Sequence, residues 1–181
     1  MSFNFFGKKE KAAEAPHFVD RIYLSKGAKL NACLALVRQE PNTIFITWFS
    51  DTTKEYKEFF AQHGIDEFHV REARSIHTAM LEHKNPVFAE HHPMHAKEIE
   101  LVCNWPQKKL FVYTALDEPL LMHFGSDKVI TLMKTMGMKE DEMIENTMVS
   151  NAIGHAQKKI AAKVSMEQSA NSQAEWMMKN A

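Results

Sequence analysis

The chain has 181 residues, of which 45% are hydrophobic and 25% charged, and its formal net charge is -1. This length and composition are typical of one globular domain, and the near-zero charge gives no overall field that would hold a nucleic acid. Two cysteines, Cys33 and Cys103, are too few for a disulfide framework, so we expect a reducing, cytoplasmic setting.

Residues 1–20 are predicted to form a flexible N-terminal tail. Its start combines aromatic residues with lysines, namely Phe3, Phe5, Phe6, Lys8, Lys9 and Lys11. Such a pattern can touch an anionic membrane surface, but a loose tail in solution is the favoured interpretation because chain ends are usually frayed. No segment is apolar over the length that a signal peptide or a membrane span needs.

Organised structure is predicted to begin near Arg21. Residues 22–24 predict a short strand, and Ser25 is a suitable cap for a helix that Pro41 ends. The apolar positions of this helix recur at helical spacing and are Leu30, Cys33, Leu34 and Val37. Cys33 is therefore expected in the core.

The next segment, residues 43–49, is β-branched and aromatic throughout, which predicts a strand buried on both faces. Thr52 and Glu55 fit a capping box for the helix that follows. This helix is predicted to end at Gly64, because glycine readily adopts the left-handed conformation at helix ends.

The same alternation continues to residue 116. Further strands are predicted around residues 68–70, 87–89 and 110–113, and helices are predicted to open at Ser75 and Pro93. Strands that alternate with helices predict parallel pairing and a three-layer α/β/α fold. The α/β domain is expected to span residues 21–124.

Residues 125–181 predict a helical extension with a C-terminal tail. One helix is expected to begin at Ser126 or Asp127 and to end at Gly137, and a second to begin at Asn146 or Thr147. Apolar residues at helical spacing line the second helix, namely Val149, Ile153, Ala156, Ile160 and Val164.

The segment from Asp117 to Lys159 resembles part of SecA, the motor ATPase of bacterial preprotein translocation. The matching text includes DEPLLMHFGSDKV at 117–129, MGMKEDE at 136–142 and residues 149–159. In SecA this text joins the second RecA-like nucleotide-binding domain to a long scaffold helix. Weaker similarity runs upstream in the same order. The resemblance implies a RecA-like, P-loop NTPase-type fold and a free-standing, degenerate relative of that domain.

The sequence lacks the parts that ATP hydrolysis needs. Motors of this kind use a glycine-rich phosphate loop with a lysine, and an arginine contributed by the second domain. No two of the six glycines lie close enough to form such a loop. The interval 101–109, where SecA has an arginine-rich motif, contains no arginine, and the last arginine of the chain is Arg74. We therefore expect no ATPase activity, and no catalytic residues are assigned.

A histidine cluster is the densest group of candidate ligands. His91, His92 and His95 follow a predicted strand, and on a helix the spacings of three and four would place two imidazoles on one side. Such a pair can hold a divalent metal. The alternative interpretation is that these histidines cap the helix or contact solvent.

Two other segments are candidate binding sites. Ser50, Asp51 and Thr52 follow the most hydrophobic strand, where the amides of a helix start can bind an anion, although a plain helix cap is the simpler interpretation. The end of the chain carries Trp176, Met177 and Met178 in a polar context. They are predicted to fold back onto the domain or to dock on another protein or a second copy.

Two functions from different classes follow from these patterns. The first is a non-catalytic SecA-like interaction module without a bound cofactor, whose protein partner is either a second copy or a translocation-related protein. The second is a small metal-binding protein or metal-dependent enzyme that uses the three histidines.

Overall fold

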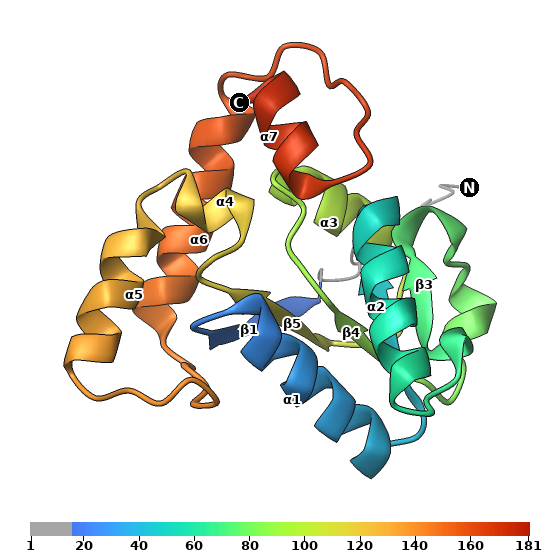
Figure 1. The fold of residues 1–181 in the computed structure, drawn as a ribbon. Coiled ribbons are helices and arrows are strands. Elements are labelled where there is room, and N and C mark those ends of the chain that lie inside the picture. The colour runs from blue at the N-terminus through green and yellow to red at the C-terminus, as the bar shows by residue number, and fades with distance from the viewer. Residues whose placement is uncertain (1–15) are drawn as a thin grey trace, which may run out of the picture.

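Residues 16–181 are described by a computed structural model, in which they form an α/β fold around a five-stranded, all-parallel sheet (Figure 1). The order across the sheet is β1-β5-β4-β2-β3. The strands are β1 (His17–Tyr23), β2 (Thr43–Thr47), β3 (Val70–Glu72), β4 (Asn85–Phe88) and β5 (Lys109–Ala115). The N-terminal phenylalanines and lysines, for which membrane contact was considered, lie outside the described residues.

Helices cover both faces of the sheet and confirm the predicted three-layer fold, an arrangement consistent with a RecA-like domain. Helices α1 (Lys26–Gln39) and α2 (Ser50–Gln62) pack on one face. Helix α3 (His95–Val102) packs on the other face with two 3-10 turns, η2 (Ala73–Ser75) and η3 (Thr78–Leu81). A third 3-10 turn, η1 (Glu67–His69), precedes β3.

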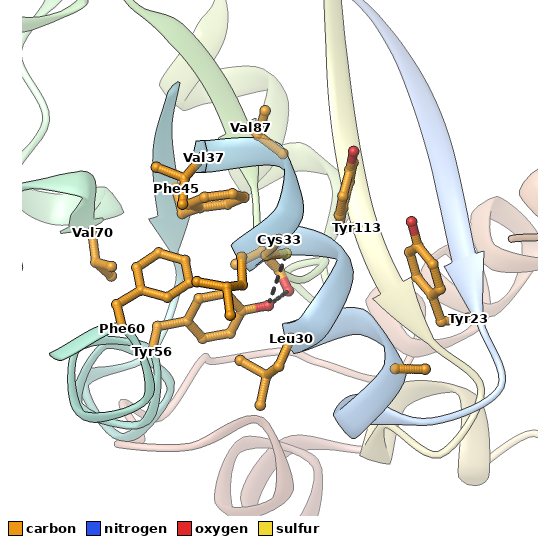
Figure 2. Close-up of a cluster of buried hydrophobic side chains, with 13 residues drawn as sticks. Tyr23, Leu30, Cys33, Val37, Phe45, Tyr56, Phe60, Val70, Val87 and Tyr113 are labelled. Atoms are coloured by element: carbon orange, nitrogen blue, oxygen red, sulfur yellow. Dashed lines mark hydrogen bonds between the residues drawn. The ribbon is translucent and has the colours of Figure 1, made fainter. Parts of the chain in front are cut away.

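The core on the α1 and α2 face is aromatic (Figure 2). Tyr56 and Phe60 of α2 reach toward Cys33 of α1, and the rings of Phe60 and Phe45 lie 5.4 Å apart. The Tyr56 hydroxyl lies 3.7 Å from the Cys33 sulfur and 3.4 Å from the Ala89 carbonyl oxygen. Burial raises the pKa of the Cys33 thiol to about 12. The expectation that Cys33 belongs to the core is confirmed, and the thiol is unreactive at neutral pH.

The remaining helices gather beyond the carboxyl edge of the sheet (Figure 1). They are α4 (Pro119–Met122), α5 (Ser126–Thr135), α6 (Thr147–Ala161) and α7 (Gln173–Asn180). Their apolar side chains share a cluster with Ile22, Leu24 and Leu116. Ile144 also pairs with Ile22 of β1 through two backbone hydrogen bonds of 2.8 and 3.0 Å. The helical extension is therefore packed against the sheet domain. None of the helices among residues 16–181 is long and apolar enough to span a membrane.

Several predicted boundaries need correction. β1 begins at His17, so the strand includes four residues that the sequence analysis gave to the tail. The helix expected to open at Ser75 is wrong, because residues 73–81 form two 3-10 turns and the Ser75 hydroxyl bonds the Glu72 carbonyl at 2.8 Å. The capping box at Thr52 is also wrong, since α2 begins at Ser50 and Phe49 is its N-cap residue.

The aromatic core gives a first prediction. Phe60→Ala leaves a cavity among Phe45, Tyr56 and Val70, so we expect it to lower the free energy of unfolding by about 3–5 kcal/mol. Urea denaturation followed by circular dichroism measures this change. Phe68→Ala is the matched control, because Phe68 is 42% exposed and its loss should cost less than about 1 kcal/mol. Equal effects of the two substitutions would contradict the packing described here.

Candidate functional site

The candidate site lies where β2 and β4 end side by side. The chain leaves β2 through α2 toward β3, and it leaves β4 through α3 toward β5, on the opposite face of the sheet. Open α/β sheets bind their ligands at such a switch point, in the crevice at the carboxyl ends of the strands. The loops that meet here are residues 48–49 after β2 and residues 89–92 after β4.

A carboxylate of the chain itself, that of Glu90, accepts hydrogen bonds from the loop after β2 and from α2. Glu90 is 4% exposed and accepts hydrogen bonds from the Trp48 amide at 2.9 Å, the Phe49 amide at 3.4 Å and the Thr52 hydroxyl at 3.0 Å. Burial raises its pKa to about 7, although nearby Lys29 opposes this shift. The acidic group at the start of α2 is therefore a side chain of the protein, Glu90.

The structure brings the predicted anion-site residues to this place but gives their donors other partners. The Thr52 hydroxyl bonds Glu90, as described above. The Asp51 amide donates to the Asn171 carbonyl at 2.9 Å, and the Ser50 hydroxyl lies 3.4 Å from the same oxygen. The start of α2 is thus closed by β4's loop and by the segment before α7.

A buried ion pair that the sequence pattern does not predict lies next to Glu90. Lys29 is 1% exposed, forms a salt bridge with Glu118 and donates to the Ala89 carbonyl at 2.6 Å. Glu118 also accepts from the Thr114 hydroxyl at 2.6 Å. Burial lowers the pKa of Lys29, but the Glu118 carboxylate outweighs that effect and raises it above its usual value. Lys29 therefore stays charged.

A small cavity of about 140 Å³ lies between these charges, and Gln173 and Ala174 of α7 form one side of it. Lys29, Glu90 and Glu118 contribute to its wall, and Gln173 to its cover. The Gln173 side chain accepts from the Leu120 amide at 2.8 Å and donates to the His91 carbonyl at 2.9 Å. These two bonds fix α7 across the switch point.

His91 belongs to a second buried network. One ring nitrogen lies 2.9 Å from Asp20 and the other 2.8 Å from Glu98, so the imidazole donates from both nitrogens and is protonated. Burial lowers its pKa, but Glu98 and Asp20 outweigh burial and raise the pKa to about 10. Glu98 is also buried, yet its histidine and glutamine donors hold its pKa at about 2.

His92 and His95 have different partners. His92 Nδ1 accepts from the Met94 amide at 3.0 Å, and its ring lies among Trp48, Phe49 and Trp176. His95 Nδ1 lies 2.7 Å from Glu98. Helix α3 begins only at His95, so the helical spacing assumed for the three histidines does not apply. Residues 16–181 contain no group of three or more side chains placed to hold a metal ion.

The C-terminal residues fold back onto this edge of the sheet. Trp176 and Met177 are buried at 1% and 8% exposure, whereas Met178 is 79% exposed. The indole of Trp176 donates to Glu167 at 2.9 Å. Of the three residues predicted to interact, the structure thus places two inside the fold and one on the surface.

No family model matches the chain. Segments of about 50 residues are similar to the protein translocase subunit SecA of several bacteria. The identity is 45% over 51 residues for Acinetobacter baumannii (strain ATCC 17978), 48% over 48 residues for Clostridium kluyveri and 52% over 50 residues for Solidesulfovibrio magneticus. Each match covers 26–28% of this chain and only 6% of the SecA protein. The chain therefore contains a SecA-related segment.

The buried ion pair gives a second prediction. Lys29→Met leaves Glu118 buried without its cation, and we expect a loss of about 3–5 kcal/mol in the free energy of unfolding. The double substitution Lys29→Met with Glu118→Leu should recover much of this loss. The control is Lys26→Met, which breaks the partly exposed pair with Glu55 and should cost at most about 1 kcal/mol. If Lys29→Met alone lowered the free energy of unfolding no more than the control does, the pairing would be refuted.

Glu90 gives a prediction for the pH dependence of stability. Its pKa rises from 4.5 to about 7 on folding, so the folded chain binds more protons than the unfolded chain between these values. The contribution of Glu90 to stability should therefore fall as the pH rises from about 5 to 7. Glu90→Gln should remove this component, which we expect to be roughly 1–3 kcal/mol.

Urea denaturation of both proteins at pH 5 and pH 8 measures this effect, and the difference between the proteins cancels the other titrating groups. The stability of Glu90→Gln relative to the parent should be greater at pH 8 than at pH 5. Parallel pH profiles would show that Glu90 titrates normally.

Proposed function

We propose that the chain is a non-catalytic SecA-like protein-interaction module that acts in protein translocation and does not hydrolyse ATP. The SecA-related segment supports the link to translocation. A protein that shares only a short segment with a large translocase subunit can share a partner or a binding surface with it. The geometry of the carboxyl edge supports the absence of catalysis.

The occupied switch point is the observation that carries this proposal. A nucleotide phosphate at this edge would need backbone amides of the loop after β2 and of the start of α2, and those of Trp48, Phe49 and Asp51 already donate to Glu90 and to the Asn171 carbonyl. It would also meet two acidic side chains, Glu90 and Glu118, with Lys29 already paired. Repulsion and lost hydrogen bonds both oppose the binding of a phosphate.

An exposed apolar stripe on α5 supports a role in protein binding. Ile130 and Met133 pack into the fold, while Val129, Leu132 and Met136 point outward with 39%, 57% and 74% exposure. Methionine and leucine side chains on a helix suit an adaptable protein interface. The metal-binding alternative has no comparable support, because His91 and His95 hydrogen-bond Glu98 and His92 accepts from the Met94 amide.

The test is direct binding of the purified full chain to purified SecA and to an unfolded secretory polypeptide, followed by fluorescence anisotropy. We expect saturable binding to at least one of them. Leu132→Asp combined with Met136→Asp should weaken binding at least tenfold, because charges replace the apolar stripe. Phe68→Asp is the matched control, since Phe68 is exposed to 42% on a different element.

The same preparations should release no phosphate from ATP above the buffer rate. Binding of neither protein up to high micromolar concentration would contradict the module, and ATP hydrolysis that copurifies with the chain would contradict the loss of catalysis. An equal effect of the Phe68 control would show that α5 is not the contact surface.

A further inference from the structure

The last part of the chain, residues 167–181, forms a self-contained unit that we name the C-terminal strap. It consists of α7 and the irregular segment before it, which the side chains of α7 bind. The bonds within the strap join Gln168 to Asn180, Ser169 to Lys179, Asn171 to Glu175, Ser172 to Glu175 and Glu167 to Trp176. These internal bonds hold the strap together, as expected for a unit that can move as one piece.

Besides the bonds of Gln173 and Asn171 described above, the strap presents one aromatic ring and one carboxylate to the side of the fold that carries α3. The Trp176 indole packs edge-on against the His92 ring, with centroids 5.6 Å apart. The Glu167 carboxylate lies 3.2 Å from the Lys97 ammonium and 3.5 Å from His92 Nε2. Ring and carboxylate are joined by the 2.9 Å hydrogen bond from the indole, so they form a single recognition element.

The surface against which Trp176 and Glu167 pack continues into a neighbouring cavity. A cavity of about 600 Å³ opens beside Glu167 and Trp176, between α3 and the turn that follows β3. Trp48, Phe49 and His92 contribute aromatic walls. The charged side chains of the wall are Lys97, Glu100 and an ion pair between Arg74 and Glu72, so Lys97 is the cation that meets the strap. Aromatic walls with a few placed charges are typical of ligand sites, and this volume lies within their usual range.

We propose that the C-terminal strap is an intramolecular ligand of the surface formed by Trp48, His92 and Lys97, and that an acidic, aromatic segment of a partner polypeptide binds this surface and the adjoining cavity in its place. The strap reveals the chemistry that the surface recognises, which is an aromatic ring beside His92 and a carboxylate beside Lys97. The inference rests on the proposed function, because it names the chemistry of a segment that an interaction module would bind.

The connection to α6 permits such an exchange. Residues 162–172 are non-helical, and Met166 within them is 82% exposed. A helix as short as α7 is marginal in water by itself, so its order depends on docking. A tethered strap competes at high effective concentration, and an external segment therefore binds only if it matches the ring and the carboxylate or is itself held nearby.

The experiment cuts the strap free without changing its contacts. A protease recognition sequence is inserted between Ser165 and Met166 of the full chain, and the folded protein is cleaved after purification. A fluorescent synthetic peptide of residues 166–181 is then added, and its exchange with the cut strap is followed by anisotropy. We expect the labelled peptide to replace the cut strap while the circular dichroism of the domain stays unchanged.

Competition then tests the chemistry of the ligand. An acidic, tryptophan-containing peptide of unrelated sequence should displace the labelled strap, and its versions with Trp→Ala or Glu→Gln should do so at least tenfold less well. Lys97→Glu in the cut protein should weaken binding of the labelled peptide about tenfold. Lys54→Glu, on the exposed side of α2, should leave this binding unchanged.

Three results would overturn the inference. The domain could unfold when the strap leaves, the cut strap could fail to exchange with the peptide, or the unrelated peptides could compete without regard to Trp or Glu. Each outcome is independent of the binding test on α5. Exchange without binding of SecA or unfolded polypeptide would reject the proposed function, and binding without exchange would reject only the role of the strap.

Discussion

The pairing of Lys29 with Glu118 is the interaction on which the arrangement of the carboxyl edge depends. A buried ammonium and a buried carboxylate are each costly alone, so α1 and the start of α4 are held together. Lys29 also donates to the carbonyl of Ala89, which fixes the end of β4 and hence the position of Glu90. Because Glu90 lies beside a lysine that is already paired, its own charge is poorly compensated.

Two buried glutamates near the end of β4, Glu90 and Glu98, show how strongly the hydrogen-bond donors around a carboxyl group affect its pKa. Glu98 accepts from three side chains and one backbone amide, with distances of 2.7 to 3.0 Å, and stays ionised. Glu90 accepts from two amides and one hydroxyl, none of which carries a charge. The positive His91 next to Glu98 accounts for the contrast, because burial alone raises the pKa of both acids.

The sequence predicted the sheet well because apolar runs and helix caps are local signals. Ser25, for example, caps α1 as expected. Lys29 was missed although it lies on the stripe of Cys33 and Val37, because its partner is 89 residues away. The prediction for the three histidines assumes that they share a helix, but α3 begins only at His95. The sequence does carry a local signal for the start of α7, because Ser172 and Glu175 form a capping pair. The place where α7 docks cannot be inferred, because its contacts are too distant in sequence.

The pairing of Ile144 with Ile22 has a consequence for how this sheet meets other proteins. Among the described strands, β1 and β3 are the two edges, and unpaired edges invite strand addition from other chains. Ile144 blocks β1 near its carboxyl end, and β3 has only three residues, with its Glu72 carbonyl bound by Ser75. At these two places the sheet therefore offers little free backbone to a foreign strand or a stacked aggregate. An interaction module of the kind proposed would then bind its partner through helices and side-chain pockets, where the partner's sequence can be discriminated.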